Sequence, residues 1–192
     1  MMKQRHLKNN NKGYSLVEMI ICIAVIAILS GIALVTITLL HSAKAKEASV
    51  TFTSELSDTA IKAKNQVVVI ETDDGSKVKY PNYNFCLKLY KDDDRYYIKK
   101  GYYNPEAGSE ATKYIFPEAG NPNDGKGISL SSKVTITYTP EGGTEADLDY
   151  VYIVYDRKGR CINGSGMYSF YKNQEALIAD VKVNKNGSYQ SY

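Results

Sequence analysis

Residues 9–40 read NNNKGYSLVEMIICIAVIAILSGIALVTITLL and contain the longest apolar run of the chain. No residue from Met19 to Leu40 is charged, and about 20 apolar residues in a helix cover the hydrocarbon core of a bilayer. A secretory signal peptide has a shorter apolar core, of about 7–15 residues, followed by a cleavage site with small residues. The sequence therefore predicts a membrane-spanning helix.

The segment before this run is basic. Residues 1–13 contain Lys3, Arg5, Lys8 and Lys12 and no acidic residue. Basic flanks stay on the cytoplasmic side of a membrane, so we expect a single-pass protein whose C-terminal part lies outside the cytoplasm.

Glu18 stands out because it is a carboxylate at the start of the apolar run. A charged side chain at the bilayer centre costs about 2.5–3.5 kcal/mol, and less near the edge. One interpretation is that the span begins one turn later and leaves Glu18 among the lipid headgroups. The other is that Glu18 has a function, because ionisable residues in spanning helices commonly do.

The residues around Glu18 favour the second interpretation. The stretch KGYSLVEMI, residues 12–20, closely resembles the N-terminus of type IV prepilins, with glutamate at the fifth place after Gly13. The resemblance implies that a prepilin peptidase cuts after Gly13 and methylates the new N-terminal amine on Tyr14. Family members commonly have phenylalanine at this position, and Tyr14 keeps the aromatic ring.

The resemblance also gives Glu18 a role. In filaments of the family, this glutamate pairs with the N-terminal amine of a neighbouring subunit. The implied function is a structural subunit of a type IV pilus or pseudopilus, first a membrane precursor and then part of a cell-surface or periplasmic filament. Its partners would be the peptidase, other pilin subunits, the assembly platform and the membrane. The sequence leaves open whether the chain is a major or a minor pilin. It also leaves open whether the filament is a pilus, a competence pseudopilus or a type II secretion pseudopilus.

The helical pattern continues beyond the apolar run without proline or glycine to about Gln66. An apolar stripe with helical spacing follows this second half. We therefore expect four parts: a leader at 1–13, a transmembrane and filament-core helix at 14–40, its amphipathic continuation at 41–66, and an external β-rich domain at 67–192. The stripe consists of Ala45, Ala48, Phe52, Leu56, Ala60 and Ala63.

The rest of the chain has the pattern of β-structure. Asp74-Gly75 and Lys158-Gly159 are turn signals between apolar runs, and KVTITYT alternates apolar residues with threonines. The predicted fold class is α+β, with a long N-terminal helix packed against an antiparallel sheet. The stretch from Tyr102 to Ile128 reads as an exposed, loop-rich insert. The predicted hairpins and strands cover 66–80, 85–103, 133–139, 149–162 and 176–183, before a polar tail.

The residue types argue against an enzyme. The only histidines are His6, in the leader, and His41, at the membrane edge, so the external domain has no histidine base for a Ser or Cys nucleophile. No phosphate-binding glycine loop occurs, and we expect no cofactor. We also expect no metal, although two clusters, Asp92–Asp94 and the loop around Asn121, Asn123 and Asp124, carry oxygen ligands suited to calcium.

The charge balance argues against a nucleic-acid partner. Removal of the four leader cations leaves 20 Lys and Arg against 21 Asp and Glu, which is close to neutral. A competence role would be the one route to nucleic acid. The 17 tyrosines could stack on sugars or bases, but the alternation of Tyr150 and Tyr152 with aliphatic residues favours packing on a sheet.

The three cysteines leave two alternatives open. Cys22 lies in the apolar run, whereas Cys86 and Cys161 both fall in the external domain. A disulfide between Cys86 and Cys161 is chemically reasonable outside the cytoplasm, and two separate thiols are the alternative.

Two other classes of protein fit parts of the sequence. A single-pass anchored binding module would keep its leader and never polymerise. An anchored enzyme would need a pair of catalytic carboxylates among the external acidic residues.

Overall fold

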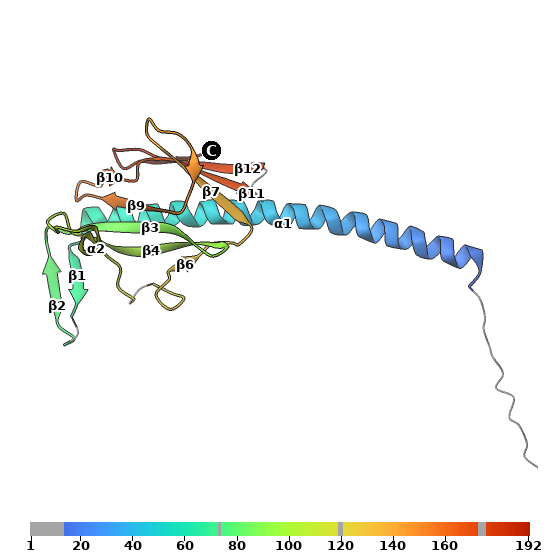
Figure 1. The fold of residues 1–192 in the computed structure, drawn as a ribbon, viewed down its shortest axis with the longest axis horizontal. Helices are drawn as coiled ribbons and strands as arrows, with labels where there is room; N and C mark the ends of the chain where they lie inside the picture. Colours follow the sequence, from blue (N-terminus) through green and yellow to red (C-terminus); the bar gives the residue numbers. More distant parts are fainter. Residues whose placement is uncertain (1–13, 73, 119–120, 173–175) are drawn as a thin grey trace, which may run out of the picture. The chain divides into compact units, whose positions relative to one another are not determined.

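The computed structural model describes residues 14–72, 74–118, 121–172 and 176–192 (Figure 1). The chain divides into two compact units, residues 1–39 and 40–192. The long helix α1 (Leu16–Asn65) begins in the first unit and continues into the second. The predicted helix from Tyr14 to Gln66 is therefore confirmed to within two residues at each end.

In the first unit, α1 exposes apolar side chains all around its axis. Its residues from Leu16 to Leu39 are all exposed. The hydroxyls of Ser30 and Thr36 donate hydrogen bonds to the carbonyl oxygens four residues earlier, at 2.7 and 2.9 Å. These polar groups are satisfied within the helix, as a membrane interior requires. Among the described residues, α1 is the one helix with the length and composition to cross a membrane.

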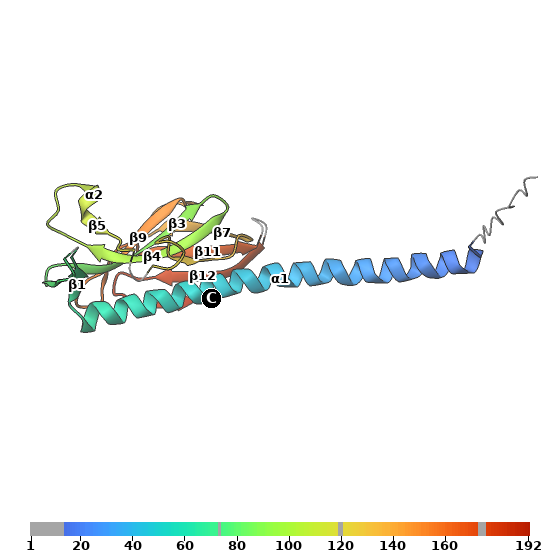
Figure 2. The same cartoon turned by 90° about the horizontal axis from the view of Figure 1, so that it is seen from below.

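In the second unit, α1 buries the stripe that its sequence predicts. Phe52 and Leu56 are fully buried, and Ala45, Ala48 and Ala63 are nearly so. Asp58 and Lys62, both partly exposed, form an i,i+4 ion pair at 2.7 Å. In Figure 2 the strands lie on one side of this part of the helix.

The rest of the second unit consists of thirteen described strands and one short helix. The first half contains β1 (Val68–Glu71), β2 (Lys77–Tyr80), β3 (Asn84–Asp92), β4 (Arg95–Tyr103), α2 (Glu110–Lys113), β5 (Tyr114–Ile115) and β6 (Ile128–Ser129). The second half contains β7 (Val134–Pro140), β8 (Ala146–Asp147), β9 (Tyr150–Tyr155), β10 (Cys161–Asn163), β11 (Gly166–Lys172), β12 (Ala176–Val183) and β13 (Tyr189–Ser191).

The described strands form two larger antiparallel sheets and a two-stranded ribbon. The first sheet has the order β10-β9-β3-β4-β5, with β6 also paired to β4. The second has the order β13-β12-β11-β7-β8, and β1 pairs with β2 in the ribbon. The α+β class and the packing of the helix against antiparallel strands are confirmed, but the strands form two main sheets where one was predicted.

Both sheets contribute to the core that covers the helical stripe. The ring of Phe52 lies 4.9 Å from that of Tyr168 and 5.8 Å from that of Phe170, both on β11. From the first sheet, Leu87 and Leu89 of β3 are fully buried in the same cluster. Leu87 and Leu89 lie two residues apart on β3 and therefore point to the same face of the sheet.

Three details differ from the sequence prediction. The polar tail after 183 is not a free end, because β13 folds back and pairs with β12. The central strand β11 was not predicted. The stretch from Tyr102 to Ile128, predicted to be exposed, contains the buried residue Asn121. β11 pairs with β7, and Asn121 bonds to Lys100, so both depend on partners that are distant in the sequence and leave no local signal.

Candidate functional site

The first turn of α1 is closed by a pair of reciprocal hydrogen bonds between Ser15 and Glu18. The carboxylate oxygen Oε2 of Glu18 accepts from the backbone N–H of Ser15 at 2.8 Å. The hydroxyl of Ser15 accepts from the backbone N–H of Glu18 at 3.2 Å. This arrangement is a capping box, which satisfies two N–H groups that have no partner inside the helix. Ser15 and Glu18 therefore fix where α1 begins.

The residues of the predicted cleavage site flank this turn. Gly13 lies outside the described residues. Tyr14 is described and is 82% exposed, directly before the capping serine. After cleavage at Gly13, the new amine would stand on Tyr14, one residue before the helix cap. Since the N-terminus of a helix carries partial positive charge, an anion nearby would stabilise a free amine there.

Glu18 has the capacity to provide that anion. An ionised carboxylate has two oxygens and about four acceptor sites. The capping box uses one oxygen of Glu18, so the group can cap its own helix and also accept from an amine. The 22 residues from Met19 to Leu40 would extend over about 33 Å of helix, close to the thickness of the hydrocarbon core. Glu18 would then lie at one edge of the bilayer.

Cys86 and Cys161 do not form the disulfide that the sequence left open. Both are free and buried, Cys86 on β3 and Cys161 on β10. Cys86 pairs with Val154 and Cys161 pairs with Tyr155, on opposite edges of β9. Successive residues of a strand point to opposite faces, so the two thiols lie on opposite faces of the sheet. Two strand spacings separate them by about 9–10 Å, beyond the ~7 Å reach of a disulfide.

Burial also makes both thiols unreactive. It raises the pKa of the Cys86 thiol far above its usual range and that of Cys161 to about 11. On its face, Cys86 is a neighbour of Gly101, and the ring of Phe116 occupies the space where a side chain at position 101 would stand. The thiolate, which is the reactive form, is therefore scarce at neutral pH.

We expect all three cysteines to be unpaired. Denaturation in urea without a reductant, followed by alkylation, should add three labels, one each at Cys22, Cys86 and Cys161. The measurement is the intact mass before and after labelling. If the protein takes one label without a reductant and three after reduction, Cys86 and Cys161 form a disulfide. That result would contradict the separation of β3 and β10.

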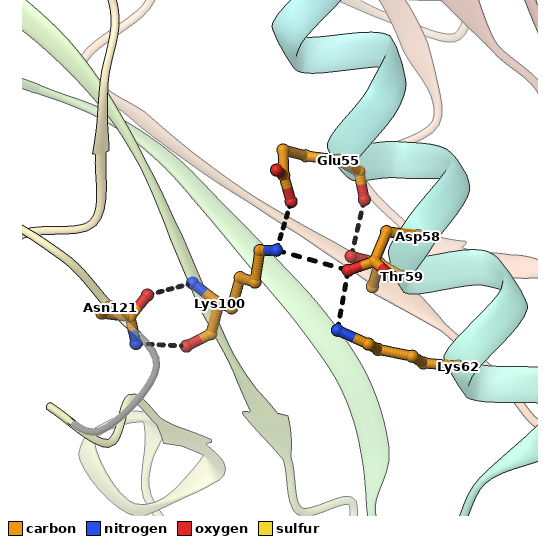
Figure 3. Close-up of polar contacts among 6 residues, drawn as sticks. All are labelled: Glu55, Asp58, Thr59, Lys62, Lys100 and Asn121. Atoms are coloured by element: carbon orange, nitrogen blue, oxygen red, sulfur yellow. Dashed lines mark hydrogen bonds and ion pairs between the residues drawn. The ribbon is translucent and has the colours of Figure 1, made fainter.

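A network of charged residues joins α1 to the first sheet (Figure 3). The ammonium of Lys100, on β4, lies 2.6 Å from a carboxylate oxygen of Glu55 and 3.3 Å from one of Asp58. Asp58 also binds Lys62. The side chain of Glu55 is 15% exposed, so this carboxylate needs its cation more than a surface acid does.

The network changes the titration of two of its members. Burial raises the pKa of Asp58, but the hydrogen bonds and charges of Lys62 and Lys100 outweigh it and leave that pKa below its ordinary value of 3.8. Burial lowers the pKa of Lys100, and the contacts with Glu55 and Asp58 outweigh it and leave that pKa above 10.5. The charged forms are therefore the ones that stabilise the fold.

Replacement of Lys100 by methionine should lower the free energy of unfolding by about 1–2 kcal/mol, because Glu55 loses its cation while the partly exposed Asp58 keeps Lys62. The contribution of Asp58 is present above pH ~3.8 and is lost as the pH falls through its lower folded pKa. That of Lys100 is complete below pH 10.5 and is lost as the pH rises through its higher folded pKa. Urea unfolding at several pH values measures the difference from the unchanged protein.

The control for Lys100→Met is Lys99→Met, on the same strand and the opposite face of the sheet, with an expected effect within about 0.5 kcal/mol. Equal effects of the two variants, or a Lys100→Met effect that does not shrink as the pH falls below 3.8, would show that the network does not stabilise the domain.

Asn121 fixes the long insert to β4 and is the residue that sequence reasoning misjudged most. Its Oδ1 accepts from the backbone N–H of Lys100 at 2.7 Å, and its Nδ2 donates to the Lys100 carbonyl at 2.9 Å (Figure 3). The amide thus replaces a neighbouring strand at this edge. Buried polar groups need such partners, and these two hydrogen bonds allow the Asn121 side chain to be buried, with 7% exposed.

Some of the residues considered for calcium have other partners. Asp92 pairs with Lys126, and the side-chain amide of Asn123 donates to the carbonyl of Gly127 at 2.7 Å. Within the described parts of the chain, no group of three or more His, Cys, Asp or Glu residues is placed to hold a metal ion.

The outer face of the first sheet carries tyrosines that pack on one another. The rings of Tyr114 and Tyr152 stack with centroids 3.7 Å apart, and Tyr150 lies 5.5 Å from Tyr152. The ammonium of Lys88 lies 4.7 Å from the ring centroid of Tyr90. These contacts agree with the interpretation of the tyrosines as cover for the sheet.

Sequence reasoning missed the capping box and the Lys100 network. The first had a local signal, because serine followed three residues later by glutamate before an apolar run is typical of a helix start. The second had none, since Glu55 and Lys100 are 45 residues apart in the sequence and meet only through the fold.

Comparison with known families supports the prepilin resemblance. A family model described as the prokaryotic N-terminal methylation motif matches residues 8–34. No curated protein and no solved structure matches the chain. The matched segment contains Gly13, Tyr14, the capping box and most of the apolar run, residues 19–34. At its N-terminus the chain therefore carries the prepilin signature of type IV pilins and pseudopilins.

Proposed function

We propose that the chain is a structural subunit of a type IV pilus or a related pseudopilus. A prepilin peptidase cleaves the membrane precursor after Gly13 and methylates the amine of Tyr14. The subunit then polymerises with other pilin subunits at an assembly platform, and Glu18 pairs with the N-terminal amine of its neighbour. The observation that carries this proposal is the methylation motif at residues 8–34, with Glu18 in the first turn of an exposed apolar helix.

The physical properties of the helix support a subunit with two successive environments. Residues 16–39 expose apolar side chains on every side, which suits lipid first and neighbouring helices later. In this proposal residues 1–13 are the leader, 14–40 the membrane and filament-core helix, 41–66 its amphipathic continuation, and 67–192 the external domain.

Processing can be tested in a heterologous host. The full chain is expressed with an active prepilin peptidase and, in parallel, with a peptidase whose catalytic residues are replaced. With the active peptidase, we expect an intact mass that lacks residues 1–13 and includes one added methyl group. With the inactive peptidase, we expect the mass of the full precursor. An unchanged mass in both would refute processing and favour an anchored binding module that keeps its leader.

A further inference from the structure

A polar pocket lies in the second unit, at the part of α1 that follows the apolar run. It has a volume of about 310 Å³. Residues 44–51 of α1 form one wall, and the start of β4 and residues 129–132, which lead from β6 to β7, form the others. The volume is at the lower end of the range for small-molecule sites, ~300–1,000 Å³.

The groups that line the pocket suit a phosphate. Lys44 and Arg95 provide two cations. Arginine presents several N–H donors in a fork that matches phosphate oxygens, and lysine adds a point charge. Hydroxyl groups, which bind phosphate or the hydroxyls of a glycerol, complete the lining: Thr51, Ser129, Ser131 and Ser132.

These two cations are available to a ligand. Lys62, Lys100 and Lys126 each have an acidic partner. Among the residues that the structure describes, neither Lys44 nor Arg95 forms an ion pair. The acidic residue in the lining is Glu47, so the three charged side chains together carry a net charge of +1. That charge complements one phosphodiester.

The position of the pocket along α1 indicates where the phosphate comes from. Lys44 follows Leu40, the last residue of the charge-free run, by four residues, or about 6 Å of helix. The headgroup region on each side of a bilayer is about 5–7 Å thick beyond the hydrocarbon core. When α1 spans the membrane, Lys44 lies at the depth of the lipid phosphates.

We propose that this pocket binds the phosphodiester of an anionic glycerophospholipid in the outer leaflet while the subunit is in the membrane. The inference rests on the proposed membrane insertion of α1 but requires neither cleavage nor polymerisation. Arg95 and Lys44 hold the phosphate oxygens, and the serine hydroxyls bind the polar end of the headgroup.

Native mass spectrometry of the unprocessed full chain in detergent micelles tests this proposal. Phosphatidylglycerol is titrated into the unchanged protein, into the double variant Lys44→Gln/Arg95→Gln, and into a charge-matched control, Lys79→Gln/Lys158→Gln. We expect the first double variant to bind phosphatidylglycerol with an affinity about tenfold lower, since each basic residue near an anionic surface contributes to binding. The control, whose two lysines are exposed and lie outside this pocket, should bind like the unchanged protein.

Two further ligands distinguish a lipid from a free anion. Phosphatidylcholine, which is zwitterionic, and inorganic phosphate are titrated in the same way, and we expect both to bind weakly. The proposal would be overturned if both double variants lost phosphatidylglycerol binding equally, or if the unchanged protein bound phosphatidylcholine as well as phosphatidylglycerol. It would also be overturned if the protein bound inorganic phosphate strongly but did not bind phosphatidylglycerol. Near-UV circular dichroism checks that the variants are folded. A chain that binds the lipid through Lys44 and Arg95 but is never cleaved would refute the proposed function alone.

Discussion

Glu18→Gln is expected to abolish filament assembly while the precursor still inserts into the membrane and is cleaved after Gly13. Glutamine at this position can still accept from the Ser15 N–H, so the capping box and the start of α1 remain. What is lost is the negative charge. An unpaired carboxylate costs about 2.5–3.5 kcal/mol at the bilayer centre and less at its edge, and a neighbour's amine would relieve that cost. Loss of the charge therefore weakens subunit association by up to roughly a hundredfold. The yield of sheared filaments measures the effect.

Ser15→Ala is the matched control for Glu18→Gln. It removes the hydroxyl that accepts from the Glu18 N–H and leaves the carboxylate in place. Loss of a cap costs about 1 kcal/mol of helix stability, so filament yield should fall only slightly. Normal assembly of Glu18→Gln, or an equal loss in Ser15→Ala, would show that Glu18 acts as a helix cap and not as a charge partner.

Phe52→Ala should cause the largest loss of stability in the second unit, residues 40–192. The side chain of Phe52 is fully buried, between α1 and the second sheet, against the rings of Tyr168 and Phe170. Truncation of a buried phenylalanine leaves a cavity and typically costs about 3–5 kcal/mol. Urea unfolding of the full chain in detergent, followed by tyrosine fluorescence or near-UV circular dichroism, gives the change in the free energy of unfolding.

Val50→Ala provides the comparison for Phe52→Ala, because Val50 lies on the same helix and is 58% exposed. Its replacement should change the free energy of unfolding by less than about 0.5 kcal/mol. Similar midpoints for the two variants would mean that α1 does not pack on the sheet through Phe52.

The parts of the fold with a local signal could be predicted from the sequence. The helix follows from an uninterrupted apolar pattern, and the β1–β2 and β9–β10 hairpins follow from Asp74-Gly75 and Lys158-Gly159. The central strand β11 has no such signal. Its sequence has Met167 next to Tyr168 and Phe170 next to Tyr171, so apolar and polar residues do not alternate along the whole strand.

The same distinction applies to the candidate sites. The prepilin motif and its glutamate are contiguous, so the sequence alone points to them. Whether Cys86 and Cys161 form a disulfide could not be predicted from the sequence. The answer depends on the pairing of β3 and β10 with β9, which sets the distance between the thiols and the face of the sheet on which each lies. The pocket around Lys44 and Arg95 also required the fold, because β4 and the segment before β7 reach α1 from distant parts of the chain.

The central claim, that this chain is a processed and polymerised pilin, is tested most directly by intact mass in the native host. The protein is measured in membranes and in filaments sheared from the cell surface. We predict that the sheared fraction contains the chain without residues 1–13 and with one added methyl group on Tyr14. A chain found in membranes alone, with its leader intact, would contradict the claim.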